Sequence, residues 1–329
     1  MNTSIIITSI YPPTEAVKKF ADIGKNRVVV VGDKKTPAEW SCDGVFYLSV
    51  KEQESCGFML ANVMPYNHYC RKMIGYLYEI KNGADYIIDT DDDNLPKANW
   101  DFPPMDGEYE CINRDKGFVN IYQFFTKQKI WARGLPLNRI NETADYESAV
   151  VNTCRIGVWQ GLADEDPDVD AVYRLTDNTP CYFNEREPIV LGENTISPYN
   201  SQNTMTRKEL FPLLYLPTYV TFRFTDIMRG LVAQPIMWLY GYRLGFINAT
   251  VVQKRNPHNY MNDFISEIPM YTHSENVVDI VSSAVSVRNS ISENLLSAYE
   301  ALLNKKVVDK NELTTLNAWI NDIGRIKII

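Results

Sequence analysis

Apolar and polar positions along the first 95 residues follow two periods in turn, one typical of buried strands and one typical of helices. Apolar runs rich in β-branched residues predict strands at 4–10, 27–31, 44–48 and 85–88. Helical spacing predicts helices over 14–20 and 66–81, and the second ends at the turn signal Asn82-Gly83. Strands that alternate with helices build a largely parallel sheet covered on both faces. The predicted fold class is therefore α/β.

The pattern is less regular beyond residue 95. It predicts strands at 117–125 (one strand or a pair), 158–162 and 217–224, and helices near 168–173 and over 225–241, the last kinked at Pro235. Residues 276–303 and 309–323 have helical spacing, and Ser290-Ile-Ser-Glu293 has the form of a capping box between two helices. We expect a main domain of residues 1–255 and a helical C-terminal extension of residues 256–329. The extension either packs on the main domain or joins copies of the chain into a homo-oligomer.

Composition excludes several classes of protein. The 329 residues are 45% hydrophobic and 22% charged, as in an ordinary globular protein, and the formal net charge of −8 argues against nucleic-acid binding. No secretory signal is recognisable, and no apolar window approaches the roughly 18 residues of a membrane span. The six cysteines form no CxxC pair, which favours buried reduced thiols over a zinc site. These features predict a cytoplasmic protein.

Polar side chains follow three of the predicted strands. Tyr11, Asp33 and the acidic run Asp89-Thr-Asp-Asp-Asp-Asn94 each come directly after a strand. Ligands of such sheets bind at the carboxyl ends of the strands, so these segments should converge on one edge. Several carboxylates at one strand end suit a hard cation such as Mg²⁺ or Mn²⁺, although a solvated acidic turn is the alternative. An EF-hand calcium loop needs Gly at its sixth position and Glu at its twelfth. Counted from Asp89, these positions are Asn94 and Trp100, which excludes an EF-hand.

Other candidate residues combine charge with a helix or a turn. Arg71 and Lys72 could meet diphosphate oxygens, and Lys34 could approach a phosphate. Each of these cations could equally be an ordinary surface residue. Further candidates are Arg133 in Arg-Gly-Leu-Pro, the acidic segment 161–168, the polar segment 200–204, which is predicted to be a loop, and Asp226, which is either a catalytic base or a helix N-cap. HExxH, Walker, GxSxG and GxGxxG motifs are all missing from the sequence, which disfavours metalloprotease, NTPase, hydrolase and dinucleotide-binding functions.

Ordered motifs over residues 5–245 resemble the STELLO family of glycosyltransferases. The matching segments are 10–15, 31–37, 66–67, 71–72, 75–78, 89–94, 133–136, 161–168, 200–204 and 221–226. More distantly, Asp91-Asp-Asp93 and Arg133-Gly-Leu-Pro136 resemble the reversibly glycosylated polypeptides, which include UDP-arabinopyranose mutases. Those proteins carry a glycosylated arginine for which Arg139 is the nearest candidate here, and no role is transferred to it. The resemblance implies a GT-A-type (Rossmann-like) fold, a nucleotide-sugar donor and a divalent metal.

The predicted function is metal-dependent transfer of a sugar from a nucleotide, with UDP favoured, to a hydroxyl of a carbohydrate acceptor, as in polysaccharide biosynthesis. Asp91 and Asp93 would hold Mn²⁺ or Mg²⁺. The donor would be contacted by Tyr11, Asp33, Lys34, Arg71, Lys72, Asp92, Arg133 and Asn203. If transfer inverts the anomeric centre, Asp226 is the expected base, with Asp164 and Asp166 as alternatives, whereas retention needs no base. Three other functions stay open: a mutase acting on the donor alone, a nucleotidyltransferase, and a non-catalytic scaffold.

Overall fold

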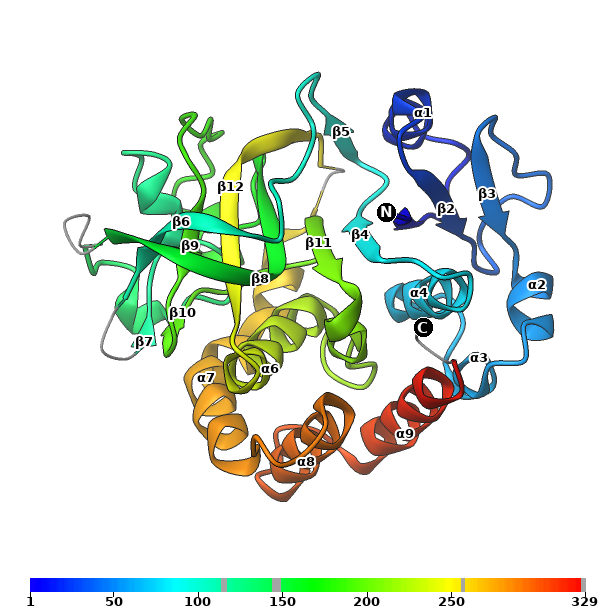
Figure 1. Ribbon diagram of the computed structural model, residues 1–329. Coiled ribbons are helices and arrows are strands. Elements are labelled where there is room, and N and C mark those ends of the chain that lie inside the picture. Colours follow the sequence, from blue (N-terminus) through cyan, green and yellow to red (C-terminus); the bar gives the residue numbers. More distant parts are fainter. Residues whose placement is uncertain (114–116, 144–148, 256–257, 327–329) are drawn as a thin grey trace.

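The N-terminal part of the chain forms parallel strands joined by helices. A computed structural model describes residues 1–113, 117–143, 149–255 and 258–326. The strands are β1 (Thr3–Thr8), β2 (Arg27–Val31), β3 (Val45–Leu48) and β4 (Tyr86–Thr90), and the helices are α1 (Glu15–Ile23), α2 (Val50–Ser55), α3 (Met59–Val63) and α4 (Lys72–Lys81). β1 lies between β2 and β4, and β3 forms the edge, with all neighbours parallel. The four predicted strands and the α/β class are confirmed (Figure 1).

Helix α4 packs close to the sheet at residue 75, which is glycine. A Cβ atom there would meet Val31 Cγ2 at 2.5 Å and Ile6 Cγ2 at 2.9 Å. The predicted helix over 66–81 starts later than expected: residues 69–71 form a 3₁₀ turn and the α-helix begins at Lys72. This close packing brings the first turn of α4 against the end of β4, where the acidic run begins.

The second half of the molecule extends the same sheet with strands of both directions. These strands are β5 (Asn94–Pro96), β6 (Asp106–Ile112), β8 (Ala149–Glu165), β9 (Ile189–Leu191), β11 (Asn203–Arg207) and β12 (Tyr242–Gln253); β7 (Gly117–Phe118) and β10 (Thr195–Ile196) pair separately. β11 is antiparallel to both β4 and β8, and β12 is parallel to β8. β6 pairs with β8 and with β9, and β9 pairs with β12. Together with the β8–β12 pair, these four strands form a closed ring of pairings. The sheet is therefore parallel only from β3 to β4 and mixed beyond.

Three predictions for the middle of the chain are wrong. Residues 117–125 form a two-residue strand followed by a 3₁₀ turn at Ile121–Phe124, and residues 217–224 end in a 3₁₀ turn at Phe222–Phe224 instead of a strand. The segment expected to be a loop at 200–204 runs into β11. In the first two cases tertiary contacts decide, since short apolar runs rich in aromatic residues have no period that separates strand from turn. In the third, Asn203 and Thr204 pair with β4 and β8 despite their polar side chains. The strand at 158–162 is confirmed as part of β8, and the helix near 168–173 as α5 (Ala171–Thr176).

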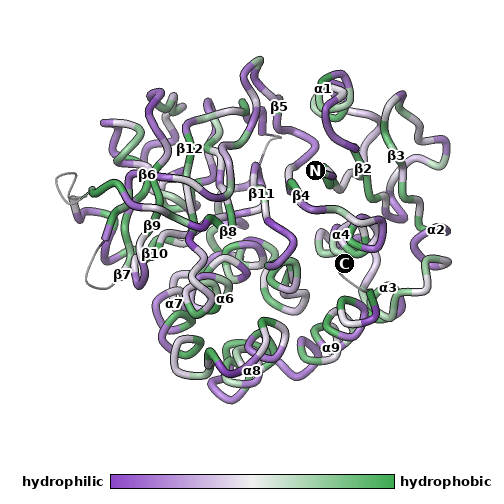
Figure 2. The backbone as a smooth tube through the Cα atoms, viewed as in Figure 1, coloured by the Kyte–Doolittle hydropathy of each residue, from purple (hydrophilic) through white to green (hydrophobic). Residues whose placement is uncertain are grey.

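The C-terminal helices pack against the rest of the molecule. They are α6 (Thr225–Leu239), α7 (Tyr260–Ala284), α8 (Ile291–Asn304) and α9 (Lys310–Arg325), and in Figure 1 they form an arc below the sheet that ends beside α3. The Ser290 capping box between α7 and α8 is confirmed. Trp319 and Tyr299 pack around Tyr215 in the main core, and Figure 2 shows hydrophobic and hydrophilic residues succeeding one another along α8 and α9. Packing on the main domain is thus observed, while homo-oligomer formation stays a prediction.

Two buried acidic side chains of α9 accept hydrogen bonds from backbone amides of other segments. Asp322 of α9 accepts hydrogen bonds from the first two amides of α3, Met59 N at 2.9 Å and Leu60 N at 2.8 Å. Glu312 of α9 accepts from Thr218 N at 3.0 Å and Tyr219 N at 2.7 Å.

Among the described residues, no helix combines the length and the hydropathy that crossing a bilayer would require.

Candidate active site

The acidic run divides into one structural carboxylate and three that face open space. Asp89, the last-but-one residue of β4, is fully buried and accepts from Tyr76 Oη at 2.6 Å and Arg229 Nη1 at 2.8 Å. Its other oxygen lies 2.6 Å from Lys72 Nζ. Two cations and a phenol therefore neutralise Asp89 inside the core. Asp91 follows β4, and its side chain is 31% exposed with Lys72 Nζ at 3.1 Å.

Asp92 and Asp93 are each held by one neighbouring strand. Ser9 Oγ, just after β1, donates to Asp92, and Thr14 Oγ1 donates to the Asp92 carbonyl at 2.7 Å. Gln253 Nε2 at the end of β12 donates to Asp93 Oδ2 at 3.3 Å. In the described structure, Asp93 Oδ1 is buried without a hydrogen-bond partner. The Asp92 and Asp93 side chains are thus held by residues at the ends of β1 and β12, and one oxygen of Asp93 can still accept a ligand.

These crowded carboxylates resist ionisation. Burial raises the pKa of Asp91 to about 7; Lys72 opposes this shift, and the charges of Asp93 and Asp89 add to it. Burial also raises the pKa of Asp92 and of Asp93 above the ordinary range. A divalent cation would remove this repulsion, and the unsatisfied Asp93 oxygen is a suitable hard ligand. No trio of His, Cys, Asp or Glu able to hold a metal occurs in the described residues, so a cation here would also need oxygens from a substrate or from water.

A cavity of about 220 Å³ opens beside this run at the carboxyl ends of the strands. Its lining brings together eight segments that are distant in sequence. The residues are Thr8, Tyr69, Asp91, Asp92, Asp93, Arg133, Asp168, Asn200, Gln202, Phe222, Arg223, Asp226, Gln253, Arg255 and His258. The convergence of strand ends on one edge, expected from the sequence, is confirmed.

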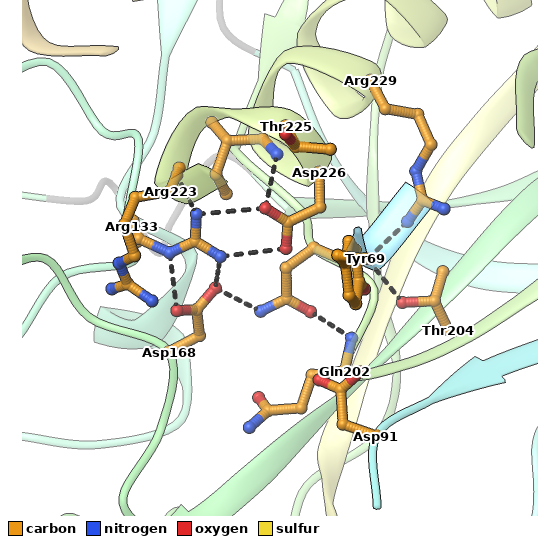
Figure 3. A network of polar contacts seen from close by, with 12 residues as sticks. Tyr69, Asp91, Arg133, Asp168, Gln202, Thr204, Arg223, Thr225, Asp226 and Arg229 are labelled. Atoms are coloured by element: carbon orange, nitrogen blue, oxygen red, sulfur yellow. Dashed lines mark hydrogen bonds and ion pairs between the residues drawn. The ribbon is translucent and has the colours of Figure 1, made fainter. Parts of the chain in front are cut away.

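Arg133 organises the wall opposite the acidic run (Figure 3). Its guanidinium donates to Asp168 from Nε at 2.7 Å and from Nη2 at 2.8 Å. It also donates to Asp226 from Nη1 at 3.1 Å and from Nη2 at 2.9 Å. These contacts hold the pKa of Asp168 well below its usual range despite burial. The turn that aims Arg133 needs Gly134, because its φ is +94° and a Cβ would meet Ile227 Cγ2 at 2.4 Å.

A second cavity, of about 280 Å³, adjoins the first at the ends of β1 and β2. The two share Thr8, Tyr69, Asp92 and Phe222 in their linings. Tyr11, which is 47% exposed, Asp33 and Arg71 also line the second cavity. A ligand with two unlike ends could therefore occupy both cavities and pass over Asp92.

Several predicted donor contacts are engaged within the protein. Arg71 is fully buried and donates to Gln53 Oε1 at 2.9 and 2.6 Å. Asp33 accepts from His68 N at 3.0 Å and from Lys34 N at 2.7 Å, and Lys34 Nζ lies 3.6 Å from the centre of the Tyr66 ring. Asp33 and Arg71 therefore line the second cavity with polar groups that are already engaged within the protein.

The other predicted residues are placed as follows. Asn203 is fully buried in β11, where it accepts from Trp100 and donates to Thr250 at 2.8 Å, whereas its neighbours Asn200 and Gln202 face the cavity. Asp164 pairs with Lys97 and accepts from Phe183 N at 2.9 Å. Asp166 pairs with Arg174.

Arg255 and His258 in the cavity wall were not predicted as functional. Both follow β12, a strand that the sequence pattern does not reveal because its apolar run continues from α6 across Gly241. The sequence signal for this pair is a histidine three residues after an arginine. Arg139, by contrast, pairs with Glu275 at 2.7 Å and Glu142 at 3.3 Å.

Comparison with known proteins shows which family the chain resembles. Residues 223–328 match a family model described as STELLO glycosyltransferases. The protein named "Probable glycosyltransferase STELLO1" from Arabidopsis thaliana is 27% identical over 340 residues, covering 97% of this chain and 44% of the plant protein. The chain is thus similar to STELLO glycosyltransferases over nearly its whole length. "Probable glycosyltransferase STELLO2" from the same plant is 26% identical over the same shares. The STELLO-like resemblance is thereby confirmed, and the chain spans less than half the length of these curated relatives.

Proposed function

We propose that this STELLO-like chain is a metal-dependent glycosyltransferase of the GT-A type that uses a nucleotide-sugar donor, with UDP favoured. The observation that supports it most is the pair of adjoining cavities at one sheet edge, joined at Asp92 and flanked by Asp91 and Asp93. A nucleotide sugar has two unlike ends joined by a diphosphate. The nucleoside would occupy the cavity beside Tyr11, and the sugar the cavity beside Arg133.

In this proposal the three carboxylates have different roles. Asp91 and Asp93 would hold Mn²⁺ or Mg²⁺ together with diphosphate oxygens, and Asp92, fixed by Ser9, would contact the ribose or the sugar. When bound, the cation would offset the negative charge of the departing diphosphate. Lys72 contributes indirectly, because its ammonium contacts Asp91 and Asp89 inside the core.

The opposite wall would orient the transferred sugar. Arg133 donates to both Asp168 and Asp226, and Asn200 Nδ2 donates to Asp168 Oδ2 at 2.7 Å. Such an array of acceptors and donors can bind several sugar hydroxyls at once. Carbohydrate hydroxyls are the acceptor class that this polar cavity favours.

Thermal shift with UDP-, GDP- and CMP-sugars, with and without Mn²⁺, tests the proposal. We expect one nucleotide to raise the melting temperature only with metal, and Asp91→Asn/Asp93→Asn to abolish that shift, because a ligand that binds only the native state stabilises it. Asp101→Asn, an exposed acidic residue paired with Lys25, is the matched control. A folded wild type without any metal-dependent shift would contradict the proposal and favour the scaffold. Conversion of a bound donor without an acceptor would favour the mutase.

A further inference from the structure

His258 stands in the wall of the main cavity with its ring fixed from one side. The residue precedes Asn259, whose side chain accepts from Met261 N and Asn262 N at 3.1 Å each and so caps α7. That cap sets the position of Asp263 in the first turn of the helix. His258 Nδ1 lies 3.1 Å from Asp263 Oδ2, and the two side chains are 31% and 16% exposed.

This pairing determines which ring nitrogen is free. An ionised carboxylate only accepts hydrogen bonds, so Asp263 selects the tautomer with the proton on Nδ1. Nε2 then carries a lone pair. Burial lowers the pKa of His258; Arg255 and Arg223 lower it further, and Asp263 opposes them. The ring is therefore neutral near pH 7 and able to accept a proton.

Asp226 has both carboxylate oxygens engaged by other groups of the protein. Both of its oxygens accept from Arg133, and Oδ1 also accepts from Ile227 N at 3.1 Å. Protonation would break these contacts and leave Arg133 buried with less compensation. His258 has no comparable engagement at Nε2 among the residues that the structure describes.

We propose that His258 is the general base of the transfer and that Asp263 positions it; this inference rests on the proposed function. The acceptor hydroxyl oxygen bonds to the anomeric carbon of the donor sugar while its proton passes to His258 Nε2. The bond between the anomeric carbon and the diphosphate oxygen breaks, and its electron pair stays on the diphosphate. The imidazolium keeps its Nδ1–H bond to Asp263 and later releases the proton to water. A base that acts on the acceptor implies inversion at the anomeric carbon.

Nitrogen-15 NMR of labelled histidine tests the state of the ring in the unmodified protein, and the chain has only 3 histidines to assign. We expect a neutral Nδ1–H ring for His258 at pH 7 with a pKa below its ordinary value. An Nε2–H tautomer, or a protonated ring at pH 7, would overturn the assignment.

Kinetics test the same role. With UDP-glucose, UDP-galactose and UDP-xylose, Mn²⁺ and water as acceptor, His258→Gln should lower UDP release about 100-fold or more without changing UDP–Mn²⁺ affinity by calorimetry. His273→Gln, further along α7, is the matched control. A loss below tenfold, or a loss of UDP–Mn²⁺ affinity that makes His258 a donor or metal contact, would overturn the base. A wild type that binds no UDP with Mn²⁺ would refute the proposed function itself and the base with it.

Asp263→Asn separates positioning from folding. The charges that face His258 are Arg255, Arg223 and Asp263, and Asp263 is the one that raises its pKa. The variant should lower the maximal rate and move the acidic limb of the pH profile to lower pH. A lowered rate with an unmoved limb would indicate a structural role only and remove Asp263 from the proposal.

Discussion

Replacing Lys72 by methionine separates a structural role of this lysine from a donor-binding role. The ammonium is fully buried and contacts Asp89 Oδ1 at 2.6 Å, the Thr90 carbonyl at 2.7 Å and Asp91 Oδ1 at 3.1 Å. Methionine preserves most of the side-chain volume and removes the charge. The perturbation therefore leaves two carboxylates and a carbonyl without their shared donor.

The expected cost follows from what remains around Asp89. Removing one partner of a buried ion pair costs about 3–5 kcal/mol. Asp89 keeps Arg229 at 2.8 Å and Tyr76 at 2.6 Å, so a loss of about 3 kcal/mol at the lower end of this range is expected. At about 2 °C per kcal/mol for a chain of this size, the melting temperature should fall by roughly 6 °C.

Urea unfolding in EDTA measures this loss without compensation by a metal. Lys34→Met is the matched control, because Lys34 is exposed and lies over the Tyr66 ring, and it should cost less than about 0.5 kcal/mol. Adding Asp91→Asn to Lys72→Met should recover about 1–2 kcal/mol, since one uncompensated carboxylate is removed. A Lys72→Met protein as stable as the control, but unable to bind UDP–Mn²⁺, would refute this reasoning and restore Lys72 to the donor contacts.

Two further predictions concern buried carboxylates that hold the cavity wall. Glu312→Gln should lower the unfolding free energy by about 1–3 kcal/mol in urea, because charged acceptors for Thr218 N and Tyr219 N are lost, while the exposed Glu300→Gln on α8 should have little effect. Equal losses in the two variants would contradict this. Burial raises the pKa of Asp170 to about 6, so its proton stabilises the fold below about pH 4 and this stabilisation is lost as the pH rises through 6. Asp170→Asn should accordingly gain stability relative to wild type between pH 4.5 and pH 7 by roughly 2 kcal/mol, and a constant difference over that interval would be inconsistent with the shift.

The local pattern of apolar and polar residues was sufficient to predict the strands in the first half of the sheet and the position of the acidic run at a strand end. In strand Arg27–Val31 the four valines after Arg27 are buried on both faces, and such an uninterrupted β-branched run admits few alternatives to a strand. Because strand ends in a parallel sheet share one edge, the convergence of Tyr11, Asp33 and Asp91 also follows from the alternation of strands and helices along the chain.

Only the tertiary structure decided which charged residues face the cavity. Asp89 and Lys72 belong to the same motifs as the cavity residues, yet they neutralise each other in the core, because the glycine at 75 lets α4 approach the sheet closely. Arg133 meets Asp226 across 93 positions of sequence, and no local period encodes such a contact. His258 acquires its candidate role only when β12 pairs beside β8 and carries the segment after it to the sheet edge. The sequence by itself determined where charge could collect, and long-range packing determined which of those charges remain available for chemistry.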